Sequence, residues 1–236
     1  MGYPRFIGTV IKNQFILQGE EFHHAKVRRI KEKQKIEIND LKGNVYLGIV
    51  TNVEKRAVKG KILEKIHVVE GKLCINLLLG MPNKLSKIDK LIPSITELGV
   101  KRFIPVITKN TAVKEKDIIK KISKWEKISL NSIKQCGRLF PIQIEKPVSL
   151  SEISPSSPVR IVFFEKEKKR TVKDINVQTD SVDVFIGAEG GIAETEIISL
   201  KEKGFETYSL GPYTLRMETA VIASISQINI QLASLV

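Results

Sequence analysis

From residue 73 onward, the chain alternates short apolar runs with segments of helical periodicity. Leu73–Gly80 is an apolar run typical of a strand that is covered on both faces. Apolar residues then recur at helical spacing through 86–98, and further apolar runs cover 102–107, 159–164 and 182–186. This alternation predicts an α/β domain with a mainly parallel sheet. Because such sheets bind ligands beyond the carboxyl ends of their strands, the loops there are the expected site of chemistry.

The helical segments of this domain have start and stop residues of their own. In the first, over 86–98, Ser86 is placed to cap the helix and Gly99 to terminate it. Pro93 lies inside this helix and should kink it, at a cost of roughly 3 kcal/mol. Further helices are predicted over 118–133, 194–203 and 219–232, with a last strand over 207–210.

The first 70 residues have a different pattern, with many short runs rich in β-branched and aromatic residues. Such runs predict a small β-barrel. Between them, Glu20–Ile30 is typical of a short helix with a basic cluster. We therefore predict two domains, residues 1–70 and 71–236, with the boundary near residues 68–73.

The charge is strongly positive and unevenly distributed. The formal net charge is +13, with +6 on residues 1–70, +1 from Lys72, +9 on residues 73–150 and −3 on residues 151–236. A Lys-rich, soluble surface is the simplest interpretation. The concentration of charge favours a polyanionic partner, and nucleic acid is preferred because no basic amphipathic helix carries bulky apolar residues for a membrane surface.

Several classes of protein are disfavoured by composition. No apolar run approaches the roughly 20 residues that span a bilayer. The first residues, Met1–Arg5, open no signal-peptide core. Cys74 and Cys136 are isolated and only three His are present, which argues against a disulfide scaffold or a structural metal site and predicts a cytoplasmic protein.

Two loops follow the last two predicted strands. Ile186–Ile192 has three Gly within five residues, which permits close approach of the backbone to a ligand. Leu210–Ala220 begins with a Gly-Pro turn and places Arg216 and Glu218 near a helix start. A glycine-rich turn without a ligand and a structural Arg216–Glu218 pair are the alternative interpretations.

Together the two loops resemble a known family. Gly187-Ala-Glu-Gly-Gly191, followed by Leu210-Gly-Pro-x-x-Leu-Arg-x-Glu-Thr-Ala220, resembles the uridine-specific methyltransferases of bacterial small-subunit ribosomal RNA (the RsmE family of the knotted SPOUT superfamily). The resemblance covers the whole chain. It includes Thr96–Val100, Lys134–Arg138 and an N-terminal motif with His24, Val27 and Arg29.

The resemblance implies an N-terminal PUA-like β-barrel and a C-terminal α/β-knot domain with a deep trefoil knot. It also implies S-adenosylmethionine as methyl donor and methylation of a uridine at ring nitrogen 3. The expected partners are 16S ribosomal RNA or the assembled small ribosomal subunit, and a second copy of the chain in a homodimer. By motif match, the cofactor-binding residues are Leu79, Gly187, Glu189, Gly190, Leu210, Gly211, Leu215 and Arg216.

Some positions depart from the family pattern. Ala188 replaces the usual Pro, and Tyr213 replaces a frequent Arg. Arg28 replaces Leu, and Lys134 replaces Glu. Ala188 preserves a small residue, so the first loop should keep its shape, whereas Tyr213 leaves no arginine to which a role at that position can be assigned.

We hypothesise that Arg216, with Arg138, stabilises the negative charge that develops when uridine loses its ring proton. All three His lie in the first 70 residues, which excludes a His base from the catalytic domain and leaves the proton acceptor unnamed. The candidate RNA-binding residues are basic side chains near the predicted short helix and motifs. They are Arg5, Lys26, Arg28, Arg29, Lys84 and Arg138, with Lys31 and Lys33 as further phosphate contacts and a solvated charged face as the alternative.

Two other functions remain open at this point. One is a SPOUT ribose 2'-O-methyltransferase, against which the Leu-Arg-x-Glu-Thr motif argues. The other is a non-catalytic RNA-binding or ribosome-assembly protein that keeps the fold. Binding of S-adenosylmethionine separates the latter from both enzymes, and nucleoside analysis of the modified RNA separates the two enzymes.

Overall fold

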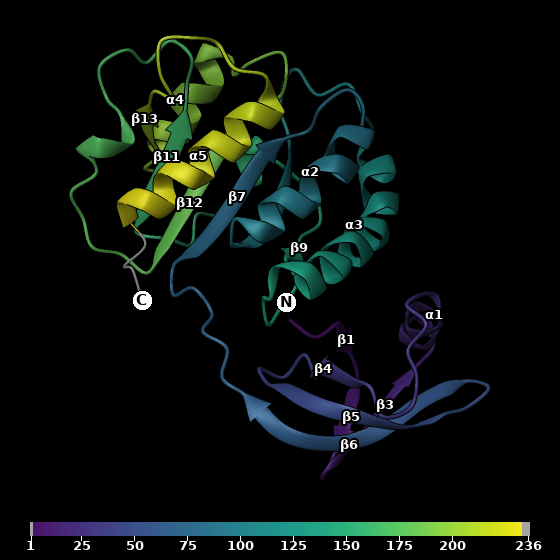
Figure 1. The fold of residues 1–236 in the computed structure, drawn as a ribbon. Helices are drawn as coiled ribbons and strands as arrows, with labels where there is room; N and C mark the ends of the chain where they lie inside the picture. The colour runs from purple at the N-terminus through teal and green to yellow at the C-terminus, as the bar shows by residue number, and fades with distance from the viewer. Residues whose placement is uncertain (1, 233–236) are drawn as a thin grey trace. The chain divides into compact units, whose positions relative to one another are not determined.

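The computed structural model describes residues 2–232 and divides the chain into two compact units. The first comprises Met1–Glu70 together with Ile133–Phe140, and the second comprises Gly71–Ser132 together with Pro141–Val236 (Figure 1). The short segment 133–140 therefore belongs to the N-terminal unit, an assignment that sequence periodicity did not reveal.

The N-terminal unit is a six-stranded sheet with one short helix, α1 (Glu20–Val27). The strand order is β1-β4-β5-β6-β3-β2, and every neighbouring pair is antiparallel except β1–β4. The strands are β1 (Arg5–Ile7), β2 (Thr9–Ile11), β3 (Gln14–Gln18), β4 (Lys35–Asn39), β5 (Val45–Val53) and β6 (Ala57–Ile66). Because the two edge strands, β1 and β2, are separated only by Gly8, the sheet must curl on itself.

Glycines allow the curled sheet to close over its core. A Cβ at Gly60 would lie 2.2 Å from the Ile49 carbonyl oxygen and 2.3 Å from the Phe15 ring. A Cβ at Gly48 would lie 2.7 Å from the same ring. The Phe15 ring thus packs directly against the backbone at Gly48 and Gly60. It joins Phe6 and other apolar side chains in the core of this unit.

The 133–140 segment is fastened to this unit by polar contacts. The Arg5 guanidinium donates to Glu37 at 2.8 Å and to the Gly137 carbonyl oxygen at 2.7 Å. Asn39 donates to the Leu139 carbonyl oxygen at 2.9 Å, and Lys134 donates to Glu21 at 2.6 Å. These groups satisfy backbone carbonyls and charges that would otherwise be costly to bury.

The C-terminal unit is built on a parallel sheet, as the alternating pattern predicts. Its strand order is β10-β8-β7-β12-β11-β13, with β9 also paired to β8, and all of these pairs are parallel. The strands are β7 (Cys74–Gly80), β8 (Val100–Ile107), β9 (Gln143–Ile144), β10 (Val148–Ser149), β11 (Val159–Phe163), β12 (Ser181–Ile186) and β13 (Glu206–Tyr208).

Helices cover both faces of this sheet (Figure 1). Side chains of α2 (Ser86–Glu97), α3 (Glu115–Cys136) and α5 (Met217–Leu232) share one core cluster with Leu77 and Leu79 of β7. Leu78, the intervening residue, faces the other cluster with α4 (Glu194–Glu202). The short 3-10 segments Leu150–Glu152 and Val172–Asp174 lie in the connections. Among residues 2–232, no helix is long and apolar enough to span a membrane.

The helix ends were predicted in part. Gly99 and Gly204 end α2 and α4 with positive φ values of 89° and 82°. The prediction that Ser86 caps α2 is wrong, since Leu85 precedes the helix in a helical conformation and no side chain caps it. The chain enters α2 through a turn, in which the Lys87 N–H donates to the Lys84 carbonyl oxygen at 3.0 Å. α2 continues as one helix through Pro93.

The connection between β11 and β12, residues 164–180, contacts the C-terminal segment of the chain. The Ser209 N–H donates to the Arg170 carbonyl oxygen at 2.7 Å, and the Gln231 side chain of α5 donates to the Ile175 carbonyl oxygen at 2.9 Å. The 164–180 connection therefore lies against both the end of β13 and the end of α5. This arrangement is compatible with the expected trefoil knot, which stays a prediction.

Candidate active site

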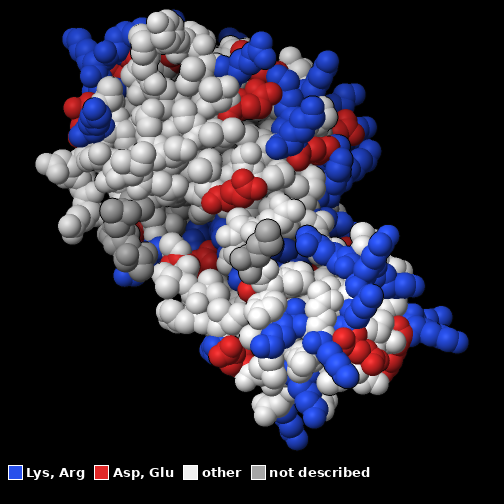
Figure 2. Space-filling model, viewed as in Figure 1, with Lys and Arg blue, Asp and Glu red and all other residues white. Residues whose placement is uncertain are grey.

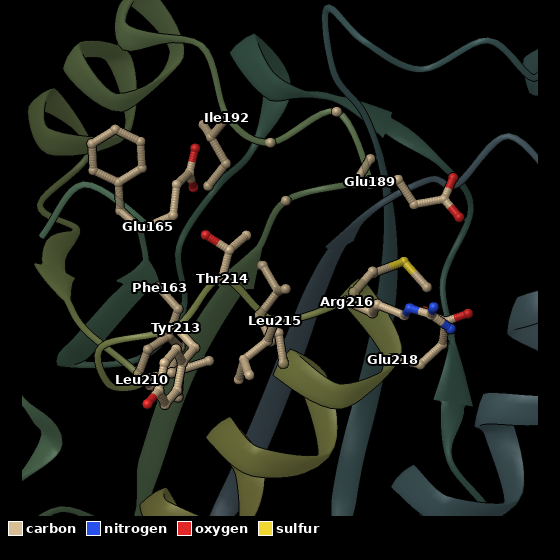
Figure 3. Close-up of a pocket in the computed structure, with 18 of the residues that line it drawn as sticks. Phe163, Glu165, Glu189, Ile192, Leu210, Tyr213, Thr214, Leu215, Arg216 and Glu218 are labelled. Carbon is tan, nitrogen blue, oxygen red and sulfur yellow. The ribbon is translucent and has the colours of Figure 1, made fainter.

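A cavity of about 620 Å³ opens at the carboxyl ends of β11, β12 and β13 (Figure 3). Its walls are the two loops singled out in the sequence, 187–193 and 209–216, together with Phe163, Phe164 and Glu165 after β11. Because neighbouring parallel strands end at the same edge, three separate connections meet there. The fold thus gathers the two loops into one site, as expected for a sheet of this kind.

The first loop depends on glycine. A Cβ at Gly187 would lie 2.6 Å from the Ile192 side chain, and Gly191 has a positive φ of 71°. The Gly191 N–H donates to the Ala188 carbonyl oxygen at 3.0 Å, which closes a tight turn. Ala188 is buried, and the backbone turn at this position forms without a proline. The loop presents backbone groups to the cavity rather than bulky side chains.

The second loop leads directly into α5. The Ser209 hydroxyl accepts from the Gly211 N–H at 3.2 Å, and Gly211 has a positive φ of 129°. Tyr213 is 82% exposed at the rim. Arg216 is exposed and lines the cavity immediately before α5, and its side chain makes no hydrogen bond or ion pair within residues 2–232. Its guanidinium is therefore available to a ligand.

A lysine from α2 joins the two loops. The Lys87 ammonium forms ion pairs with Glu189 of the first loop and, at 3.3 Å, with Glu218 in the first turn of α5. The Glu189 carboxylate also accepts from the Asn83 N–H at 3.4 Å. One Glu218 oxygen, Oε2, is buried without a hydrogen-bond partner within residues 2–232. The structural-pair interpretation of Arg216 and Glu218 is therefore wrong, because the ion-pair partner of Glu218 is Lys87.

The charged side chains at this edge of the sheet shift one another's pKa values. Hydrogen bonds to Glu189 and Glu218 raise the pKa of the Lys87 ammonium. The backbone N–H of Glu218, helped by Lys87 and Arg216, holds the pKa of the Glu218 carboxyl below its usual value, although burial opposes this. Glu165 adds a third carboxylate to the lining, beside Glu189 and Glu218. The site is thus an apolar cavity with an acidic rim and two cations.

Most of the predicted cofactor residues meet in this cavity. Those that line it are Gly187, Glu189, Gly190, Leu210, Gly211, Leu215 and Arg216. Leu79 does not, since it is fully buried beneath the cavity in the sheet core, where it pairs with Ile186. Sequence reasoning missed Lys87, Glu165 and Phe163. The available signal was their position just after β7 and β11, strands that end at the same sheet edge.

The other predicted site residues lie elsewhere. Arg138 belongs to the N-terminal unit, its side chain is 10% exposed, and its Nε lies 3.2 Å from Glu70. Arg5 is equally enclosed, with a 12% exposed side chain bound to Glu37. Arg5 thus forms an ion pair with Glu37 and Arg138 forms one with Glu70, and the RNA contacts predicted for these two arginines stay predictions.

The remaining predicted RNA-binding residues are exposed. Lys26, Arg28 and Arg29 lie on and just after α1, and Lys84 precedes α2. The Lys26 ammonium lies 5.5 Å from the centre of the Phe22 ring. Lys84 does not line the cavity, whereas Lys87, one helical turn further, does.

Comparison with known proteins agrees with this fold and site. The family model of the RNA methyltransferase domain matches residues 69–229, and that of the RNA methyltransferase PUA domain matches residues 17–63. The fold and site are therefore those of an RNA methyltransferase with an N-terminal PUA domain.

The relatives define the family more narrowly. The ribosomal RNA small subunit methyltransferase E of Aquifex aeolicus is 36% identical over 91% of this chain and 93% of its own length. A methyltransferase of Legionella pneumophila, solved with bound SAM, covers 100% of both chains with a TM-score of 0.90 and 26% identity. The ribosomal RNA small subunit methyltransferase E of Neisseria gonorrhoeae, also solved with S-adenosyl methionine, covers 98% of this chain and 99% of its own, with a TM-score of 0.88 and 25% identity. The chain belongs to the ribosomal RNA small subunit methyltransferase E family.

Proposed function

We propose that this protein transfers a methyl group from S-adenosylmethionine to nitrogen 3 of a uridine in small-subunit ribosomal RNA. The observation that carries the proposal is the convergence of the Gly187–Gly191 and Leu210–Glu218 motifs on one cavity. Relatives with the same fold bind this methyl donor and are named for the same RNA class.

The cavity fits S-adenosylmethionine chemically. Phe163, Ile186 and Leu215 give it an apolar lining of the kind that holds a purine. Three lining carboxylates, Glu165, Glu189 and Glu218, face two cations, so the rim favours a ligand that carries net positive charge. When bound, the donor supplies a methyl group on a positively charged sulfur.

The protein's own contribution is orientation and electrostatics. Methyl transfer requires the donor and acceptor to be aligned, and a rigid loop built on glycine turns supplies that alignment. A uridine ring nitrogen is a poor nucleophile until its proton leaves, and the free Arg216 guanidinium at the cavity rim would stabilise the resulting anion. None of the three His residues lines this cavity. Arg138, whose guanidinium is paired with Glu70 in the N-terminal unit, stays a second proposed contributor to this stabilisation.

The proposed RNA contacts include the N-terminal unit. Lys26, Arg28 and Arg29 are exposed around α1 and carry the positive charge that phosphates attract. Residues 1–70 then bind RNA and residues 71–236 carry the chemistry. Lys84 remains a proposed RNA contact near the start of α2.

The proposed active form is a homodimer. The outward face of α5 carries no charge, and Ile222 and Ile230 on it are 40% and 85% exposed. Thr219, Ala223 and Ser226 complete this face at helical spacing. Figure 2 shows a wide uncharged surface over α5. A second copy of the chain would remove these apolar side chains from water.

The deciding experiment is methyl transfer from labelled S-adenosylmethionine to small ribosomal subunits that lack the modification, followed by nucleoside digestion and mass spectrometry. Label in 3-methyluridine is the expected result. Label in a 2'-O-methyl nucleoside would identify a ribose methyltransferase instead. Absence of both label and cofactor binding would favour the non-catalytic RNA-binding alternative.

A further inference from the structure

One side of α3 carries a row of lysines. Lys116, Lys120, Lys124 and Lys127 follow one another at intervals of four, four and three residues, and all four are exposed. At 3.6 residues per turn they lie within an arc of about 80° and extend over about 16 Å of helix. We call these four residues the α3 lysine row. All of them belong to the C-terminal unit.

The opposite side of α3 explains why the row faces outward. Ile118 and Trp125 are fully buried in the core, and the Trp125 indole N–H donates to Asp89 at 2.8 Å. α3 is therefore held in one rotation about its own axis. The packing of Ile118 and Trp125 thus fixes the lysine row on the solvent side of the helix.

The nearby acids neutralise the row only weakly. Lys120 lies 3.5 Å from Asp117, in a pair whose side chains are 74% and 47% exposed. Lys124 lies 2.7 Å from Asp89, which already accepts from Trp125 and from Lys121. The exposed Lys120–Asp117 pair contributes about 0–1 kcal/mol, and Lys124 shares Asp89 with two other donors, so a phosphate can replace the acid as the partner of either lysine.

The row belongs to a unit whose charge is unevenly divided. Residues 73–150, which include α2 and α3, carry a net charge of +9, whereas residues 151–236 carry −3. Figure 2 shows blue side chains gathered on the side of the C-terminal unit where α2 and α3 lie, and none over the white surface of α5. A uniformly Lys-rich surface would not produce this division.

We propose that the α3 lysine row is a second RNA-binding surface, which holds the sugar–phosphate backbone of the substrate outside the cofactor cavity. This inference rests on the proposed function. Successive lysines are about 4.5–6 Å apart along the helix axis, which gives a linear array of point charges suited to a phosphate chain. A membrane surface fits less well, because the apolar side of α3 is already buried in the core and has nothing to insert into lipid.

The test compares two variants of equal charge change. In the first, Lys116, Lys120, Lys124 and Lys127 are all changed to Gln. In the second, four exposed lysines of the acidic segment are changed to Gln, namely Lys168, Lys169, Lys173 and Lys201. Binding of a fluorescent small-subunit ribosomal RNA transcript is measured by anisotropy over a series of salt concentrations. Binding of S-adenosylmethionine, measured by calorimetry, verifies that each variant is folded.

We expect the α3 variant to lose roughly tenfold or more in RNA affinity at low salt, and its log–log salt slope to fall by about 3, since each phosphate contact contributes about 0.7. The matched variant should change little, and cofactor affinity should be equal in both. Equal losses in the two variants would show a general charge effect and overturn the proposal. Unchanged RNA affinity in the α3 variant would also overturn the proposal. The proposed methyl transfer would still stand in that case, provided that the wild type modifies RNA. Tighter binding of the wild type to phosphatidylserine vesicles than to RNA would also overturn the proposal for α3, in favour of a membrane partner.

Discussion

Asp183 offers a direct test of how the C-terminal sheet is held together. Its carboxylate is 2% exposed in the centre of the sheet, where β12 pairs with β7. It accepts from Asn76 Nδ2 at 2.7 Å, from the Ser157 hydroxyl at 2.7 Å, and from the Ser156 and Ser157 N–H groups at 2.7 and 3.2 Å. One side chain therefore joins β12, β7 and the connection before β11.

Replacing Asp183 by Ala removes an acceptor from all four donors. The N–H and hydroxyl of the buried Ser157 lose this partner outright, whereas Asn76 keeps the two serine hydroxyls as acceptors and Ser156 is exposed. Each unpaired buried donor costs about 1–3 kcal/mol. We take about 4 kcal/mol as the expected loss. For a unit of this size each kcal/mol lowers Tm by about 2–4 °C, which gives a decrease of roughly 10 °C.

The assay is thermal unfolding followed by circular dichroism, with Asp180→Ala as the matched control. Asp180 lies three residues earlier and its side chain is exposed, so its removal should change Tm by less than about 2 °C. Asp183 does not line the cavity, and cofactor affinity well below Tm should stay within twofold. A decrease in Tm of less than 3 °C for Asp183→Ala would refute the argument that this carboxylate holds the three segments.

Three further predictions concern the site and its surroundings. Lys87→Met removes the ammonium that links Glu189 of the first loop to Glu218 of α5, so the two loops lose a shared contact and calorimetry should show S-adenosylmethionine affinity falling roughly tenfold, whereas Lys90→Met on the exposed side of α2 should have no effect. Gly187→Val should abolish cofactor binding while far-ultraviolet circular dichroism is unchanged, because even a Cβ there meets Ile192 at 2.6 Å. The N–H of Lys169, with the hydroxyl of Thr207 and the N–H of Arg170, lowers the pKa of Glu167 to about 2, so its stabilisation is complete above pH 4.5 and is lost as pH falls towards 2. Glu167→Gln should flatten the decline of Tm over that range, and an unchanged slope would contradict this assignment.

The sequence predicted the strands and helices correctly in segments where the apolar residues follow one clear pattern. The runs that became β7, β11 and β12 are buried on both faces and could be recognised from apolar composition alone. The start of α2 could not, because it depends on a backbone turn at Leu85 rather than on a capping side chain. The membership of 133–140 in the N-terminal unit depends on contacts such as Asn39 with Leu139, which are 100 residues apart.

The sequence predicted which two loops form the site, but it did not predict which side chains contact one another there. Motifs placed Gly187, Arg216 and their neighbours at one edge of the sheet, and the cavity lies there. Which cation meets Glu218 depends on the rotation of α2, which brings Lys87 rather than Lys84 to the cavity. The contact of Arg138 could not be predicted either. This arginine lies within a recognisable motif, but its ion-pair partner is Glu70, 68 residues away.

The central place of β12 has a consequence for synthesis of the chain. Within residues 2–232, β12 is the strand that lies between β7 and β11, and it is formed by residues 181–186. Every residue that lines the cavity, apart from Lys87, lies between Phe163 and Ala220. In a nascent chain β11 therefore stays unpaired with the β10-β8-β7 strands until residues 181–186 have left the ribosome, and the methyl-donor pocket forms only when α5 begins. Acquisition of cofactor affinity would accordingly report that the whole C-terminal unit has folded.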